Sequence, residues 1–111
     1  MFKKPYIYDY DETWKEILKR KHNEKVYLGA FTSWDNTPRV ANRANIFKGS
    51  NPEKFEKYFR KQYFSARENN SDFLFINAWN EWAEGAHLEP DKLNNYGYLE
   101  AVRKIINEAE E

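Results

Sequence analysis

Phe73-Leu74-Phe75-Ile76 runs directly into Asn77-Ala78-Trp79-Asn80-Glu81-Trp82-Ala83-Glu84-Gly85. The apolar run, continued to Ala78, has the length and residue types of a buried β-strand. Acidic, amide and aromatic side chains follow where that strand ends, and α/β folds bind substrates at the carboxyl ends of parallel strands. The stretch from Phe73 to Pro90 therefore predicts both a strand and the position of a functional site.

The chain before this stretch shows patterns for one helix and one further strand. Residues 2–10 look extended, and Asp9 or Asp11 is suited to cap a helix. That helix is predicted from the i, i+3, i+4 spacing of Trp14, Ile17 and Leu18. Residues 25–32 form a nearly continuous apolar run, which predicts a parallel strand buried on both faces. Residues 33–50 have no apolar periodicity and predict a long loop, a kind of segment that is often functional.

Two more helices are predicted, one on each side of the Phe73 to Ala78 strand. The first begins near Ser50: either Ser50 and Glu53 form a capping box, or Asn51 is the cap and Pro52 the first helical residue. Its apolar stripe is Phe55, Tyr58, Phe59, Tyr63 and Ala66. The last helix follows the turn-rich residues 90–97, with an apolar face of Tyr98, Leu99, Val102, Ile105, Ile106 and Ala109.

This order of helices and strands predicts an α/β fold with two parallel strands and three helices. Two strands make a poor sheet, because their apolar faces need further strands or another chain. We therefore expect residues 1–111 to be a single domain that is either part of a larger barrel or a homo-oligomer formed through exposed sheet edges. A complete eight-stranded α/β barrel needs about 250 residues, and this chain has 111.

Composition limits the classes of partner and of location. The chain has 18 basic and 18 acidic residues, which gives no overall field toward nucleic acid. It has no cysteine, which excludes disulfides and thiolate metal sites. No run approaches the roughly 20 apolar residues of a membrane span, and residues 1–5 lack the apolar core of a signal peptide. We expect a soluble, cytoplasmic protein with no nucleic-acid partner and no transmembrane segment.

The residue types after the strand suit carbohydrate chemistry. Glu81 and Glu84 lie three residues apart, so a helical turn would place both carboxylates on one side. Such pairs cleave or form glycosidic bonds, one as proton donor and the other as base or nucleophile. Trp34, Trp79 and Trp82 could offer flat faces to sugar rings, while Asn77, Asn80 and Asp35 could bond hydroxyls. The alternative is a solvated acidic turn with core tryptophans, which is the usual meaning of an isolated Glu-x-x-Glu.

Other ligands fit the sequence less well. Glu84 and His87 have the Glu-x-x-His spacing of dimetal helices, but Gly85 and Pro90 interrupt any helix and there is no second such pair. We predict neither a metal nor a cofactor. Arg39, Arg43 and Lys48 could hold the phosphates of a nucleotide sugar, although solvated loop charges are the default.

Three segments, in order along the chain, resemble the C-terminal part of the WbsX-like glycosyltransferase family. They are Trp34-Asp35-Asn36-Thr37-Pro38-Arg39, the stretch from Asn77 to Pro90, and Tyr96-Gly97-Tyr98-Leu99-Glu100-Ala101. The resemblance covers the chain from about Tyr10 onward. Bacterial members of that family are associated with the synthesis of O-antigen, lipopolysaccharide and capsule. The resemblance implies a carbohydrate or nucleotide-sugar substrate.

The WbsX-like family is similar in turn to glycoside hydrolase family 99, the endo-α-mannosidases, which are (β/α)8 barrels. Their Glu-Trp-His-Glu motif matches Glu81-Trp82-Ala83-Glu84, where Ala83 replaces the histidine. By that resemblance Glu84 is the general acid/base, and Glu81 is the base that assists attack by the sugar's 2-hydroxyl. The two strands are then the last two of the eight, which makes the fold the C-terminal βαβα portion of a (β/α)8 barrel.

These arguments predict a glycosyltransferase-like protein of cell-surface polysaccharide synthesis. The alternatives are a glycan-binding or assembly module without catalysis, and a fragment of a family 99-like glycosidase. Glu81 and Glu84 are the expected catalytic residues. The expected substrate-binding residues are Trp34, Asp35, Asn36, Arg39, Asn77, Trp79, Asn80, Trp82 and His87.

Overall fold

A computed structural model describes residues 4–22 and 25–110. Its elements are helices, two short parallel strand pairs and one antiparallel pair. Residues 2–3 of the predicted extended segment lie outside the described residues. In chain order the elements are β1 (Tyr6–Asp9), α1 (Tyr10–Lys19), β2 (Gly29–Phe31), α2 (Thr37–Val40), η1 (Ala41–Arg43), β3 (Asn45–Lys48), α3 (Pro52–Glu68), β4 (Phe75–Asn77), β5 (Asn80–Glu81), η2 (Trp82–Glu84), β6 (Ala86–His87) and α4 (Gly97–Ala109).

The three longer helices form where the sequence predicts them. The Asp9 side chain caps α1 by accepting from the Glu12 amide at 2.9 Å. At α3 the Asn51 register is the one adopted, because Asn51 accepts from the Lys54 amide at 2.8 Å and Pro52 is the first helical residue. The described face of α4 is narrower than predicted: Tyr98, Ala101 and Ile105 are buried, and Ile106 is exposed.

The predicted parallel pair is present, with a second pair that the sequence analysis missed. β2 and β4 pair in parallel with Gly29 opposite Phe75 and Phe31 opposite Asn77. β1 and β3 also pair in parallel, with Tyr6 opposite Asn45. The prediction of two strands and three helices was therefore too low. The prediction of an irregular loop at residues 33–50 was also wrong, because α2, η1 and β3 lie within it. The assignment of this α/β arrangement to a (β/α)8 barrel stays a prediction.

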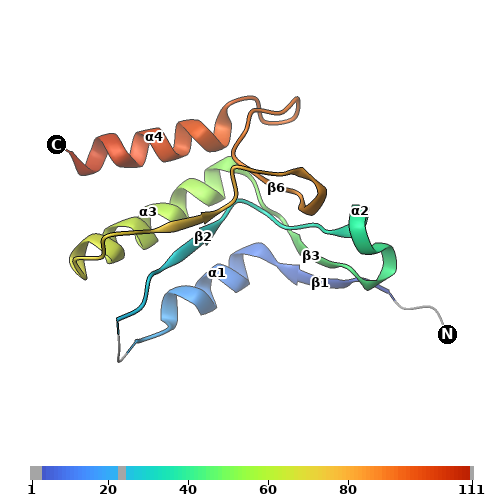
Figure 1. The fold of residues 1–111 in the computed structure, drawn as a ribbon, viewed down its shortest axis with the longest axis horizontal. Helices are drawn as coiled ribbons and strands as arrows, with labels where there is room; N and C mark the ends of the chain where they lie inside the picture. The colour runs from blue at the N-terminus through green and yellow to red at the C-terminus, as the bar shows by residue number, and fades with distance from the viewer. Residues whose placement is uncertain (1–3, 23–24, 111) are drawn as a thin grey trace.

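The core joins α1, α3 and α4 to the β2–β4 pair. Figure 1 shows α3 and α4 side by side, with β2 between them and α1. Trp14 of α1 is fully buried and stacks on Phe31 of β2 and on Tyr58 of α3. The buried residues of this cluster are Tyr10, Trp14, Ala30, Phe55, Tyr58, Phe59, Tyr98, Ala101 and Ile105.

The β2–β4 pair is open on one face around Phe75, so the prediction of strands buried on both faces was wrong. Phe75 is 60% exposed, and it lies with Tyr27 and Phe73 in a cluster of exposed aromatic rings. Strand residues alternate between two faces: Ala30 and Ile76 pack into the helical core on one face, and on the other face Phe31 is covered by Trp14 of α1, whereas Phe75 is not covered. Self-association through an uncovered sheet stays a prediction. None of the helices within the described ranges is long and apolar enough to cross a membrane.

Asp11, near the start of α1, joins this helix to α3 by two short charge-assisted contacts. Its carboxylate accepts from Lys54 Nζ at 2.6 Å and from the Tyr58 hydroxyl at 2.5 Å. The hydrogen bond from Lys54, followed by the one from Tyr58, lowers the pKa of Asp11. Burial, reinforced by the Asp11 carboxylate, raises the pKa of Tyr58 to about 12.

Replacing Asp11 with alanine should lower the free energy of unfolding at pH 7 by about 2 kcal/mol, the usual cost of losing hydrogen bonds to a charged group. The folded pKa of Asp11 is lowered, so its contribution is complete above the unfolded pKa of about 3.9 and is lost as the pH falls through the folded value. Urea unfolding at pH 7 and pH 3 should therefore show a smaller difference at pH 3. Glu16→Ala, which breaks an exposed pair with Lys19, is the control and should cost about 0.5 kcal/mol or less.

Candidate functional site

The segments that follow β2 and β4 lie together, as the sequence analysis predicts. The Thr32 amide donates to the Asn77 carbonyl at 3.2 Å, which continues the parallel pairing past the strand ends. Beyond it the Asp35 amide donates to the Glu84 carbonyl at 2.8 Å, and the Ser33 hydroxyl donates to the Gly85 carbonyl. The two loops are thus joined by backbone groups, and the turn that holds Glu81 and Glu84 is fixed on the loop that follows β2.

The turn itself consists of the β5–β6 hairpin with η2 between its strands. Asn80 pairs with His87 and Glu81 with Ala86. Gly85 ends η2 in the left-handed region at φ +60°, where the Gly85 amide donates to the Trp82 carbonyl. A Cβ at Gly85 would lie 3.2 Å from the Asp35 amide nitrogen and 3.3 Å from its carbonyl oxygen. Glycine is required both by this backbone conformation and by the close approach of Asp35.

Arg39 contacts both predicted catalytic glutamates. Its Nη2 lies 3.8 Å from Glu81 Oε2, and its Nε lies 3.7 Å from Glu84 Oε1. The side chains are 47% exposed for Glu81 and 25% for Glu84, so both carboxylates are accessible to a ligand. Arg39 follows Pro38 in α2, which places the guanidinium opposite η2. One guanidinium therefore holds two carboxylates within reach of the same ligand.

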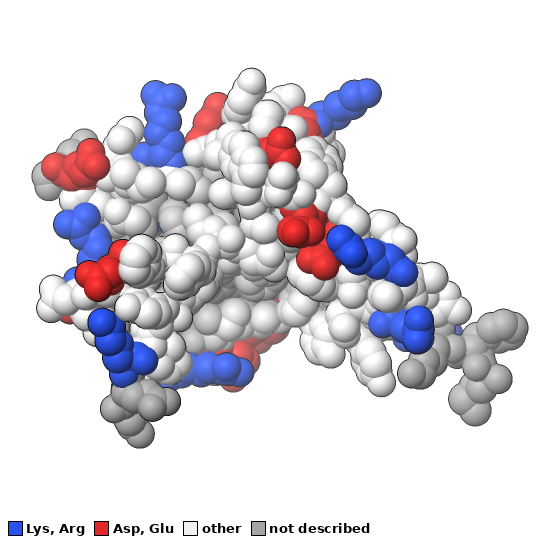
Figure 2. All heavy atoms as spheres, viewed as in Figure 1, with Lys and Arg blue, Asp and Glu red and all other residues white. Residues whose placement is uncertain are grey.

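Charges elsewhere are mixed, as the balanced composition implies. Figure 2 shows acidic and basic side chains interspersed over the visible face.

The described residues contain no group of three or more potential metal-ligating side chains.

Trp82 and His87 form a stacked pair beside the two glutamates. Their ring centroids are 3.8 Å apart and their planes differ by 13°. The Trp82 indole N–H donates to Glu89 Oε1 at 3.0 Å, and His87 Nε2 lies 2.8 Å from Asp91 Oδ2. Burial alone would raise the pKa of Asp91, but hydrogen bonds from the Asn94 amide and from His87 outweigh it and lower that pKa. His87 therefore contacts an aromatic ring and a carboxylate.

The other predicted substrate-binding residues lie in two kinds of position. Trp79 is 53% exposed, and Asn77 and Asn80 are also exposed near the Glu81 turn, so all three are available to a ligand. Asp35 and Asn36 serve their own loop: Asp35 Oδ1 accepts from Thr37, and Asn36 Oδ1 accepts from the Asn45 amide at 2.8 Å. Trp34 is half-buried, and its carbonyl accepts from the Phe47 amide.

Sequence reasoning missed the part of this surface formed by the segment before α4. A hollow of about 620 Å³ beside Trp82 is lined by Pro90, Asp91, Lys92, Asn95 and Tyr96. The sequence signal that could have indicated this surface is Tyr96, an aromatic residue in a turn-rich segment and outside the apolar face of any predicted helix or strand. It is 59% exposed.

Comparison of the sequence with known proteins identifies the family of this chain. Residues 1–102 match the family described as Glycosyltransferase WbsX. The chain belongs to the WbsX family. Two curated relatives, each named "Uncharacterized protein WxcX", come from Xanthomonas campestris pv. campestris. The chain is 33% identical to the protein of strain B100 over 107 residues, which is 93% of this chain. It is also 33% identical to the protein of strain ATCC 33913 over 104 residues, 86% of this chain.

This WbsX family chain spans only 15% of the length of each of those relatives. No solved structure matches it. The match confirms the family that the motifs at Trp34, Asn77 and Tyr96 resemble.

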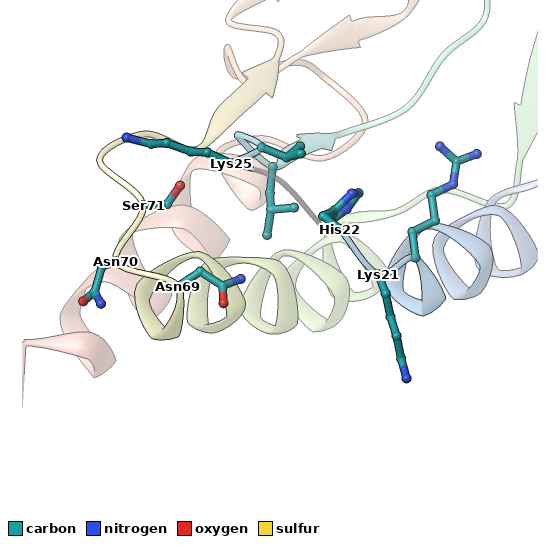
Figure 3. A pocket seen from close by; sticks show the side chains of 9 residues that line it. Lys21, His22, Lys25, Asn69, Asn70 and Ser71 are labelled. Carbon is teal, nitrogen blue, oxygen red and sulfur yellow. The ribbon is translucent and has the colours of Figure 1, made fainter.

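Another hollow lies at the other end of the strands. It has a volume of about 630 Å³ and is lined by Arg20, Lys21, His22, Lys25, Val26, Leu28, Asn69, Asn70 and Ser71. These residues precede β2 and β4, whereas α/β folds place their chemistry after the strands. Figure 3 shows that the labelled side chains point in several directions and do not converge. The Glu81 turn therefore stays the stronger candidate site of this WbsX family chain.

Replacing Gly85 with alanine should destabilise the chain by about 1–2 kcal/mol and loosen the Asp35 contact, because the new Cβ meets backbone and φ is positive. Urea unfolding followed by circular dichroism measures the loss. Gly29→Ala is the matched control, since a Cβ there would have an ordinary 3.7 Å contact. Equal midpoints for the two variants would contradict the role given to Gly85.

Proposed function

We propose that this chain acts in glycosyl transfer during synthesis of a bacterial cell-surface polysaccharide, with Glu84 and Glu81 as its acid/base pair. The observation that supports this most directly is the contact of one guanidinium with both carboxylates, in a chain that belongs to the WbsX family. The substrates are a sugar donor, such as a nucleotide sugar, and a carbohydrate acceptor.

Two proton transfers define the work of the pair. When the bond between the anomeric carbon and its leaving oxygen breaks, negative charge develops on that oxygen, and Glu84 neutralises the charge with its proton. When a hydroxyl attacks the anomeric carbon, it loses a proton, which Glu81 takes. The attacking hydroxyl is that of the acceptor sugar or, in the route that the resemblance to family 99 implies, first the donor's own 2-hydroxyl, which gives a 1,2-anhydro sugar. The acceptor hydroxyl then opens that ring at the anomeric carbon, Glu84 as carboxylate takes the acceptor's proton, and Glu81 returns its proton to the 2-oxygen. Arg39 holds both carboxylates on one side of the reacting sugar.

The remaining strands of the proposed (β/α)8 barrel would complete the surroundings of the pair. In the described residues the β2–β4 sheet has one open face with exposed Phe73 and Phe75. Apolar strand residues of this kind are covered by neighbouring strands in a closed barrel. The proposed barrel thus accounts for both the open face and the position of the glutamates after the strands.

A second candidate function is glycan binding without catalysis. Its support is the exposure of the two tryptophans near the carboxylates, 53% for Trp79 and 49% for Trp82. Exposed aromatic faces bind sugar rings whether or not chemistry follows.

Incubation of the purified chain with nucleotide sugars and oligosaccharide acceptors, followed by mass spectrometry of the products, tests the first candidate. A product one sugar longer than the acceptor supports transfer, and free sugar above the no-protein control supports hydrolysis. Glycan binding without either product supports the second candidate.

A further inference from the structure

Trp82 and Tyr96 line one hollow from two different segments. The hollow of about 620 Å³ lies between η2 and the turn at residues 90–96. Trp82 is 49% exposed and Tyr96 is 59% exposed, so both rings are accessible from solvent. Large aromatic side chains that stay exposed around a hollow offer a ligand apolar area without the cost of opening a core.

The Trp82 ring is held in place before any ligand arrives. Its stack on His87 covers one ring face, and its indole N–H is bonded to Glu89. His87 is in turn fixed by Asp91, whose other oxygen accepts from the Asn94 amide at 2.6 Å. Trp82 nevertheless stays 49% exposed and lines the hollow, and because the ring is already oriented, binding does not have to order it.

The turn that leads to Tyr96 is closed by its own backbone. Asp91 and Asn95 exchange amide-to-carbonyl hydrogen bonds of 3.2 and 2.8 Å, and the Gly97 amide donates to the Asn94 carbonyl. Asn95 adopts a positive φ of 52°, which suits an asparagine in a tight turn. Tyr96 then leads directly into α4. The second aromatic ring therefore extends from an ordered turn joined through Asp91 to the first.

We propose that this hollow, lined by Trp82 and Tyr96, is a subsite for one pyranose ring of the carbohydrate acceptor, next to the Glu81 and Glu84 pair. Trp82 is the first residue of η2, which also carries Glu84 and follows Glu81 directly, so the hollow and the carboxylates share one short turn of the chain. Sugar rings present C–H groups on their faces and hydroxyls at their edges. Aromatic faces match the former, and Asn95 and Lys92 at the rim match the latter.

This assignment rests on the proposed carbohydrate function, whose catalytic part the rate of the Glu84→Gln variant tests separately. A nucleobase of a nucleotide-sugar donor also stacks on aromatic rings, so the experiment includes free nucleotides.

The test is binding of the purified chain to an array of oligosaccharides from capsules and O-antigens. Tyr96→Ala should weaken binding to the recognised glycans about tenfold, the loss typical of one aromatic contact. Tyr96→Phe keeps the ring and should bind as the unchanged chain does. Leu93→Ala is the matched control: Leu93 is in the same turn and 86% exposed, but it does not line the hollow. It should have no effect.

Three results would overturn the subsite. They are equal weakening by Leu93→Ala and Tyr96→Ala, competition by free UDP or GDP that requires Tyr96, and failure of the unchanged chain to bind any printed glycan. Binding that needs Tyr96 but occurs in a chain with no turnover supports the subsite and contradicts only the proposed catalysis. Turnover that is lost in Glu84→Gln but whose acceptor KM is unchanged in Tyr96→Ala contradicts only the subsite.

Discussion

Glu84→Gln should lower the rate of glycosyl transfer or hydrolysis by about 100- to 10,000-fold, the range that a positioned acid or base contributes. Glutamine keeps the shape of glutamate but cannot donate a carboxylic proton to the leaving oxygen. Glu81→Gln should lower the rate by a similar factor, because the attacking hydroxyl would lose its base. The measurement is product formation from a nucleotide sugar or an aryl glycoside, with each variant at the same protein concentration.

The fold should survive both substitutions. The contacts from Arg39 are 3.7 and 3.8 Å long and lie at the surface, where ion pairs contribute about 1 kcal/mol or less. Circular dichroism and urea midpoints should therefore match those of the unchanged chain. A loss of activity with a retained fold then reports on chemistry and not on stability.

The matched control is Glu68→Gln. Glu68 is an exposed glutamate in the last turn of α3, outside the candidate site. The Glu68→Gln variant should therefore have the activity of the unchanged chain. Wild-type rates in Glu84→Gln would contradict the acid/base assignment. If Glu84→Gln also left glycan binding unchanged in a chain without turnover, the binding module would be the better description.

Local patterns were enough to predict the helices of the core and that the segments after β2 and β4 meet. The cap at Asp9, the Asn51 and Pro52 register and the apolar spacing of α1 and α3 are short-range features, and each appears in the structure. The strands β2 and β4 were predicted for the same reason, although both are shorter than their apolar runs.

Features that depend on distant residues were not predictable in this way. β3 pairs with β1 across 39 residues at the Tyr6–Asn45 register, and the mixed residues 45–48 give no local strand signal. A continuous apolar run indicates that both faces of a strand favour burial. It does not indicate whether this chain has other elements to pack on both faces, and so the exposure of Phe75 was missed. The position of Arg39 between two glutamates likewise depends on the loop-to-loop contact of Asp35 with Glu84.

The largest loss of stability is expected at Trp14. Its side chain is fully buried, with stacked neighbours on both sides: Phe31 at 5.6 Å and Tyr58 at 5.5 Å between ring centroids. Trp14→Ala removes both stacks and leaves a cavity, which typically costs 3–5 kcal/mol. Small proteins have total stabilities of about 5–15 kcal/mol, so this variant should be at or near the limit of folding.

Trp14→Phe separates the loss of packing from the loss of the indole. The Trp14 Nε1 atom is buried without a hydrogen-bond partner among the described residues, and an unsatisfied donor of this kind costs about 1–3 kcal/mol. Phenylalanine keeps a ring between Phe31 and Tyr58 and removes that donor. The smaller ring leaves a small void, so we expect a net loss of only about 1 kcal/mol.

Urea unfolding measures both variants, and Trp79→Ala provides the control for loss of a tryptophan. Trp79 is 53% exposed, so its removal should change the free energy of unfolding by about 0.5 kcal/mol or less. A midpoint for Trp14→Ala near that of the unchanged chain would contradict the core described here. Because Trp14 packs on Phe31, which directly precedes the Thr32 to Asp35 segment joined to the Glu84 turn, Trp14→Ala should also lower glycan binding, and Trp14→Phe should preserve it.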